Sequence, residues 1–163
     1  MSVLITTEIL GENPALISVN TNLDLVNAWV RSGDGLIGFG EYKKFEVKGE
    51  NRFKEAKVWW EERVSEFKIQ NNVHGSGTGP ILFTSFSFDP DQISVLIIPK
   101  IVIGRKNGKS WITWIGDNKQ PDLEKINSAP ISGEITRQEG SISEQAWQSQ
   151  VSSAINAIKS NKL

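Results

Sequence analysis

The sequence predicts an α+β fold in which locally paired strands are covered by two amphipathic helices. Short β-branched and aliphatic runs recur between residues 3 and 115, and glycine-containing turns separate them. Two longer segments, 53–67 and 143–161, repeat apolar residues at helical spacing. Because no internal repeat, charge block or low-complexity tract divides the 163 residues, we expect a single unit over 1–163.

The first half of the chain predicts strands followed by a helix. Residues 3–10 are β-branched and aliphatic and form the first predicted strand. A sheet region follows over 23–47, where Asp34-Gly35 between two β-prone runs is a hairpin signal. A helix then begins after Asn51, its expected N-cap. Its apolar stripe comprises Phe53, Ala56, Trp60, Val64 and Phe67.

After a polar, glycine-rich loop, the second half predicts an antiparallel meander. Its strands cover 81–88, 93–99, 101–104 and 110–115. Alternatively, the predicted strands over 93–99 and 101–104 are one bent strand, with Pro99 at an edge or bulge. Asn107-Gly108 is a two-residue turn signal.

The remaining residues predict a surface connection and a final helix. Prolines, glycines and polar residues mark the connection over 116–141, with one short strand near 131–136. The helix runs from Ser143 to about Asn161 and needs a surface to cover its apolar stripe. That stripe comprises Trp147, Val151, Ala154, Ile155 and Ile158.

Composition narrows the kinds of partner and site. Lys and Arg number 18 against 19 Asp and Glu, so the net charge of -1 offers no field for nucleic acid or an anionic membrane. The absence of cysteine excludes a disulfide framework, a thiolate zinc site and a Cys nucleophile. The first residues lack a basic signal-peptide region, and no apolar run approaches the roughly 18 residues of a membrane-spanning helix. We therefore expect a cytoplasmic protein that binds neither nucleic acid nor membrane.

Several motifs suggest chemistry, but each is better explained structurally. The loop 75–80 lacks the third glycine of a dinucleotide fingerprint, and 104–110 lacks the leading glycine of a P-loop. His74 is the sole histidine and is interpreted as a solvated loop residue. Asp89-Pro90-Asp91 is typical of a turn, and Glu61-Glu62 belongs to a solvated helix face.

The six tryptophans are more typical of packing in the core and between layers than of platforms on which bases or sugars stack, because no basic groove is evident beside them. Trp60 and Trp147 lie on helix stripes, and Trp111 and Trp114 fall on opposite faces of one predicted strand. From the residues alone we assign no catalytic, cofactor-binding or metal-binding position.

A series of segments, taken in order, resembles the N-terminal region of isochorismate synthases. The segments are Trp29 to Gly40, Gly49 to Ala56, Trp59-Trp60, Gly77 to Phe83, Ser85 to Asp89, Ser94 to Pro99, Gly104 to Thr113, and Trp147 to Lys159. The resemblance extends from about residue 23 to Leu163. Thr84 departs from it, since the family usually has glycine there.

The resemblance implies the α/β/β/α fold of chorismate-using enzymes, in which helices flank two packed antiparallel sheets. It also implies an isomerase that converts chorismate to isochorismate with Mg²⁺, for menaquinone or siderophore biosynthesis. A lysine base would activate water, and a carboxylic acid would assist loss of the 4-hydroxyl. Anthranilate, aminodeoxychorismate and salicylate synthases stay open as alternatives within the family.

The place of the resembling segments along the family's sequence decides which functional residues can be assigned to this chain. In the family, the helix that resembles 143–161 leads into the strand with the catalytic lysine, and the acid, Mg²⁺ ligands and substrate-binding residues follow. No catalytic or metal-binding residue is therefore carried over. We expect a fragment that is inactive alone and whose partner is the missing C-terminal part of its domain. A free-standing, non-catalytic scaffold domain is the alternative from a different class.

Overall fold

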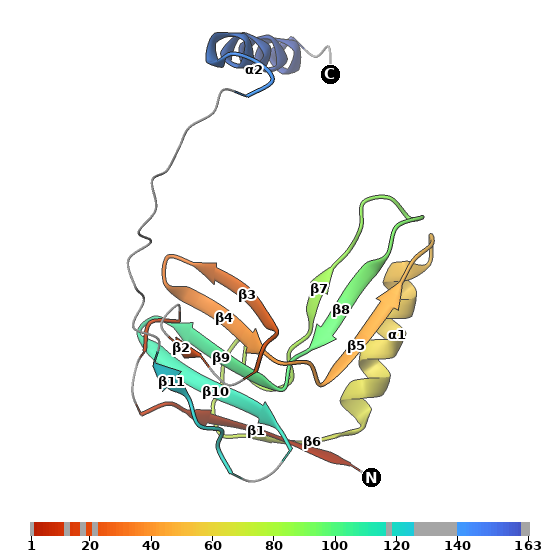
Figure 1. Cartoon of the computed structure of the whole chain (residues 1–163). Helices are drawn as coiled ribbons and strands as arrows, with labels where there is room; N and C mark the ends of the chain where they lie inside the picture. The colour runs from red at the N-terminus through yellow and green to blue at the C-terminus, as the bar shows by residue number, and fades with distance from the viewer. Residues whose placement is uncertain are drawn as a thin grey trace. The chain divides into compact units, whose positions relative to one another are not determined.

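The computed structural model describes residues 2–11, 14–16, 19–20, 23–116, 119–125 and 140–160. The chain divides into two compact units, residues 1–128 and 129–163. Within the described residues, the first unit holds the strands and helix α1, and the second holds helix α2 (Figure 1). The α+β fold class is confirmed, while a single unit over 1–163 stays a prediction.

Six strands of the first unit form its largest sheet, in the order β3-β4-β9-β10-β1-β6. All neighbours are antiparallel except β1 and β6, which are parallel. The strands are β1 (Val3–Ile9), β3 (Val26–Arg31), β4 (Asp34–Phe39), β6 (Phe67–Asn71), β9 (Ile101–Lys106) and β10 (Lys109–Ile115). The predicted opening strand is thereby confirmed.

Both hairpins of this sheet turn on two residues with positive φ. Asn107 and Gly108 have φ of 51° and 74°, as type I′ turns require, which confirms the predicted turn. In the first hairpin the turn residues are Ser32 and Gly33, with φ of 52° and 84°. The hairpin prediction is right but its turn position is wrong, because Asp34 already pairs with Arg31 across the strands.

One face of the six-stranded sheet carries the main hydrophobic core. Ile37, Ile103 and Ile112 lie in one row across β4, β9 and β10. The next row of the same face holds Phe39, Ile101 and Trp114. All six side chains are buried, and the buried Leu16 packs with them.

The opposite face is covered by the glycine-rich segment that follows β6. Trp111 lies on this face and donates its indole N–H to the Gly77 carbonyl at 2.9 Å. The Gly79 N–H donates to the Thr7 hydroxyl at 3.2 Å, and that hydroxyl lies 2.9 Å from the hydroxyl of Thr113. Because both faces are covered, Trp111 and Trp114 are both buried, as their placement on opposite faces predicts.

A second, three-stranded sheet carries helix α1 on one face. It comprises β5 (Lys43–Val47), β8 (Ser94–Ile98) and β7 (Phe83–Ser85) in the antiparallel order β5-β8-β7. Ala56 of α1 is buried against Val47 and Leu96. Beside them the rings of Phe45 and Trp59 stack with centroids 5.2 Å apart.

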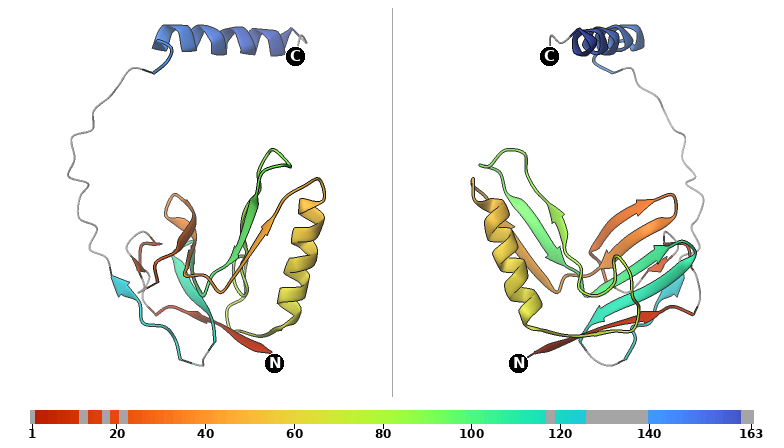
Figure 2. Two further views of the ribbon diagram at one scale, coloured as in Figure 1. Left: turned by 45° about the vertical axis from the view of Figure 1, so that its right-hand side comes forward. Right: turned by 180° about the vertical axis from the view of Figure 1, so that it is seen from behind.

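The two sheets meet where β4 leads into β5 and β8 leads into β9 (Figure 2). There the Lys100 N–H donates to the Phe39 carbonyl at 3.1 Å, and the Tyr42 N–H donates to the Ile98 carbonyl at 2.8 Å. The alternative of one bent strand through Pro99 is therefore wrong, because β8 and β9 belong to different sheets. β7 is also shorter than the predicted strand over 81–88.

Helix α1 (Arg52–Ser65) begins at the predicted N-cap, Asn51, although that side chain makes no capping bond. The buried residue of its first turn is Arg52, whereas the predicted stripe member Phe53 is exposed. Arg52 donates to the carbonyl of Gly49 at 3.0 Å and to that of Phe88 at 3.4 Å. The bond to Phe88 ties the start of α1 to the loop between β7 and β8, whereas the bond to Gly49 is local to the turn that precedes the helix.

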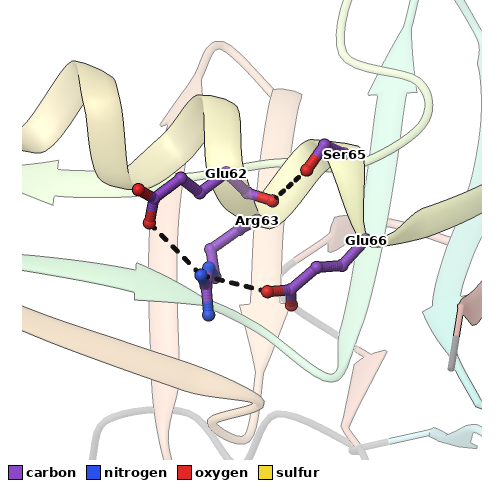
Figure 3. Close-up of polar contacts among 4 residues, drawn as sticks. All are labelled: Glu62, Arg63, Ser65 and Glu66. Carbon is purple, nitrogen blue, oxygen red and sulfur yellow. Dashed lines mark hydrogen bonds and ion pairs between the residues drawn. The ribbon is translucent and has the colours of Figure 1, made fainter.

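The predicted continuation of α1 through Phe67 is wrong. Ser65 donates its hydroxyl to the Glu62 carbonyl at 2.7 Å, and Arg63 pairs with Glu66 at 3.0 Å, at the end of the helix (Figure 3). The Glu66 carbonyl then accepts from the Val3 N–H, and Phe67 begins β6 in parallel register with β1. Pairing with a strand distant in sequence overrides the helical spacing of Phe67.

Other elements complete the description. β2 (Val19–Asn20) and β11 (Glu124–Lys125) pair as a small antiparallel sheet that the sequence does not predict. Helix α2 (Glu144–Lys159) confirms the final predicted helix, and its N-cap Ser143 accepts from the Ala146 N–H at 3.3 Å. Within its own unit the apolar stripe of α2 contributes no buried residue. The predicted strand near 131–136 lies outside the described residues.

Replacement of Gly104 by alanine tests the packing of β9 and β10. An added Cβ at Gly104 would overlap the Trp111 indole ring, whereas one at Gly11 would meet no atom within 4 Å. We expect Gly104→Ala to lower the free energy of unfolding by about 1–3 kcal/mol, as overpacking does. Urea unfolding followed by circular dichroism measures it, with Gly11→Ala as the matched control. Equal unfolding midpoints for the two variants would contradict this packing.

Candidate functional site

Acidic side chains and the single histidine form no metal-binding group in the described part of the chain. His74 is exposed in the loop after β6, as predicted. Glu61 and Glu62 are exposed on α1, also as predicted. Asp89 accepts from the Asp91 N–H at 2.9 Å, which confirms a turn there.

The pKa of Lys44 is raised above its usual value by a neighbouring carboxylate. The carboxylate of Glu46 raises the pKa of Lys44, first by a hydrogen bond and then by charge attraction. Lys44 is exposed on β5, and its partner lies two residues away on the same face of the strand. A raised pKa opposes loss of the proton at neutral pH, so Lys44 is poorly suited to act as a general base.

A hollow lined by aromatic, cationic and acidic residues lies over the tips of the β3–β4 and β9–β10 hairpins. We call it the hairpin groove; its volume is about 500 Å³. Its walls come from both hairpins and from the covering loop. The lining residues are Trp29, Arg31, Asp34, Gly35, Leu36, Ser76, Gly77, Arg105, Lys106, Asn107 and Trp111. A hollow of this volume falls in the range of roughly 300–1,000 Å³ used for small-molecule ligands.

Strand register explains why these residues come together. Trp29, Leu36, Gly104 and Trp111 are neighbours in one row across β3, β4, β9 and β10. Arg31 and Lys106 lie two residues further along their strands and therefore on the same face. Gly104 carries no side chain in this row, so the Trp111 ring occupies the space above it.

The tryptophan at the edge of the sheet leaves its ring available to solvent. Trp29 is 78% exposed, whereas Trp111 is buried and fixed by its bond to Gly77. The groove thus has one immobilised aromatic wall and one accessible aromatic wall. Leu36 lies between them in the same row.

Asp34 lies among the cations of the hairpin groove, directly across from Arg31 in the β3–β4 register. Neither Arg31 nor Lys106 forms an ion pair with a described residue. Asp34 instead accepts from the Asn107 N–H at 3.0 Å. Arg105 donates to the Gly33 carbonyl at 3.3 Å, while its Nε is buried without an acceptor among the described residues.

This arrangement corrects the expectation that no basic groove lies beside the tryptophans. Trp29 and Arg31 are two residues apart on one strand, a spacing that places both on one face. The two-residue spacing of Trp29 and Arg31 can be recognised in the sequence alone. The contribution of Trp111 and Lys106 depends on pairing between hairpins about 70 residues apart, which the spacing of residues within one segment does not reveal.

The structure gathers these residues without forming an acid–base pair among them, and it assigns none of them a catalytic role.

Another hollow, of about 490 Å³, lies over α1 beside Phe45 and Trp59 and is lined by charges of both signs. No helix among the described residues has the length and apolar character needed to cross a membrane.

Comparison with known proteins identifies a family for most of the chain. A family model described as chorismate binding enzyme matches residues 29–163. This span starts at Trp29 in β3 and includes both helices. No curated protein matches the chain, and no solved structure matches it.

Replacement of Trp111 by phenylalanine tests the anchoring of the covering loop. The variant removes the N–H that bonds the Gly77 carbonyl and part of a buried ring. We expect the free energy of unfolding to fall by about 1–2 kcal/mol. Trp29→Phe is the control and should change it by less than about 0.5 kcal/mol, because Trp29 is exposed. Denaturant titration measures both; an unchanged Trp111→Phe protein would contradict this anchoring.

Proposed function

This chain belongs to the chorismate-binding enzyme family, and we propose that it is the N-terminal part of an isochorismate synthase. The match over residues 29–163 carries the proposal, because it covers most of the chain. Membership in the family makes this a chorismate-using type of enzyme with chorismate as its substrate. The proposed reaction is the isomerisation of chorismate to isochorismate.

The order of the resembling segments supports this choice of reaction. Trp29 to Gly40 covers most of the β3–β4 hairpin. Ser94 to Pro99 covers β8, and Gly104 to Thr113 covers the β9–β10 turn with most of β10. Trp147 to Lys159 is most of α2. The segments that resemble isochorismate synthases therefore fall on strands and helices of the structure, in the same order along the chain.

The chemistry of the proposed reaction assigns acid–base and metal-binding roles to other residues of the domain. In isochorismate synthases a lysine and a carboxylic acid supply the proton transfers, and carboxylates hold Mg²⁺. The described residues include no group of three or more His, Cys, Asp or Glu that fits a metal ion. We therefore assign no Mg²⁺ ligand to this chain and propose that the chain is inactive alone.

Exposed apolar side chains support the view that further protein surface completes the domain. Phe88 and Ile93 in the β7–β8 region and Val26 on edge strand β3 are exposed. Within its own unit, α2 exposes Trp147 and Ile158. Contiguous exposed apolar surface marks places that another protein segment or a partner covers.

The proposed place of the enzyme in metabolism follows from its product. Isochorismate would supply menaquinone or siderophore biosynthesis, and we propose that the enzyme acts in the cytoplasm.

The coding sequence that follows Leu163 tests the proposal. We expect an in-frame strand with a lysine within the next thirty or so codons, because the helix that resembles α2 leads into that strand in isochorismate synthases. Sequencing of the gene or of its transcript provides the measurement. A stop codon with no such strand in frame would contradict the proposal and favour the scaffold domain.

A further inference from the structure

We propose that helix α2 pairs antiparallel with α2 of a second copy of this chain. The contact would be the apolar stripe of the helix, and the N-terminal end of each α2 would meet the C-terminal end of the other. The inference does not rest on the proposed isomerase reaction. It rests on the exposure, the spacing and the charges of α2.

The apolar stripe of α2 has the spacing of a face that pairs with another helix. Trp147, Val151, Ala154 and Ile158 are separated by four, three and four residues, as the a and d positions of a heptad are. Trp147 is 56% exposed and Ile158 is 61% exposed. The opposite face of the helix carries glutamine, serine and asparagine side chains. One face of α2 is therefore apolar and open, while the other is polar.

The helix has little within itself that keeps it folded. Helices of about 15 residues are marginal in water, because most helical stability in proteins comes from packing of an apolar face. Within its own unit, none of the 16 residues of α2 is buried. The Ser143 cap and the 3.3 Å bond from Gln148 to Glu144 contribute only modestly. A partner that buries the stripe would supply the remaining stabilisation.

The charges of α2 favour an antiparallel second copy as that partner. Within residues 144–159 the charged residues are Glu144 and Lys159, in the first and last turns of the helix. An antiparallel pair brings Glu144 of each copy near Lys159 of the other, whereas a parallel pair would bring like charges together. Because the antiparallel pair is two-fold symmetric, the favourable contact forms twice. The helix dipoles also run in opposite directions in this arrangement.

The residues of the stripe specify the register of the pair. When Trp147 lies opposite Ile158 of the second copy, Val151 lies opposite Ala154, because both pairs share one midpoint along the helix. A larger side chain then lies beside a smaller one in every layer of the contact. The stripe is therefore complementary to itself in the antiparallel direction.

A hollow at the N-terminal end of α2 matches the end of the second copy that this register brings to it. Its volume is about 430 Å³, and its lining includes the apolar side chains of Ile142 and Trp147 and the carboxylate-bearing Glu144. The second copy would present Ile158 and Lys159 there, an apolar side chain followed by a cation. In this register Glu144 and Lys159 of the second copy are two residues, or about 3 Å, apart along the axis.

Sedimentation equilibrium of the 163-residue chain tests the pairing. Because the contact is short and belongs to the weak class of interfaces, the protein is studied from about 10 µM to about 1 mM. We expect a monomer–dimer equilibrium. Glu144→Lys and Lys159→Glu should each weaken the dimer about tenfold, because two ion pairs become two repulsions. An equimolar mixture of the two variants should restore the dimer, since every lysine then faces a glutamate.

Substitutions on the polar face of α2 provide the matched controls. Gln145→Lys and Asn156→Glu introduce the same residue types away from the stripe and should associate as the unchanged chain does. Trp147→Ala should weaken the dimer about tenfold or more without changing any charge, because it removes the largest side chain of the stripe. Circular dichroism checks that each variant keeps the fold of the first unit. Unfolding of α2 in one variant would not produce rescue in the mixture.

A monomer at every concentration would overturn the pairing and indicate that another surface covers α2. Association that none of the α2 variants changes would also overturn it, because the contact would then lie in the first unit. Single charge variants that associate as tightly as the unchanged chain would overturn the antiparallel arrangement. None of these results depends on chorismate turnover, so failure here leaves the proposed function unaffected.

Discussion

The packing of Trp111 over Gly104 is the contact on which the arrangement of the first unit depends. Because position 104 has no side chain, the indole lies flat on β9 and reaches the Gly77 carbonyl. That bond holds the glycine-rich segment across the sheet, and the bond from Gly79 to Thr7 holds it further along. The same segment then enters β7 of the second sheet. The Trp111 contact thus holds the covering segment on the first sheet and also forms a wall of the hairpin groove.

Local sequence patterns predict the elements whose stability is decided locally. The Asn107-Gly108 turn and the start of the last helix near Ser143 depend on neighbouring residues, and both are confirmed. Phe67 is different, because its helical spacing competes with a parallel pairing to Val3. Long-range pairing decides that position, and no pattern within a short segment contains it.

The candidate site shows the same division between local and long-range information. Alternation within β3 is enough to place Trp29 and Arg31 on one face. Lys106 and Trp111 join them only because β4 pairs with β9, and the residues between these strands include all of α1 and the second sheet. The interpretation of the tryptophans as core residues holds for Trp111 and Trp114 but is wrong for Trp29, which lies on an edge strand.

The architecture of this chain and its family membership are identified from different observations. An α+β arrangement of two sheets accommodates many activities, so the architecture by itself does not identify one. Family membership instead rests on the match over residues 29–163. The described residues bring cations and aromatic rings together in the hairpin groove, and they include no group of three or more His, Cys, Asp or Glu that could hold a metal ion.

The most direct test of the central claim is the identity of the product made by this chain together with the residues encoded after Leu163. The longer protein is incubated with chorismate and Mg²⁺, and the products are separated and identified by mass spectrometry, with the 163-residue chain alone as the control. The account predicts isochorismate from the longer protein and unchanged chorismate from the control. Salicylate with pyruvate, or an aminated product formed in the presence of ammonia, would contradict it.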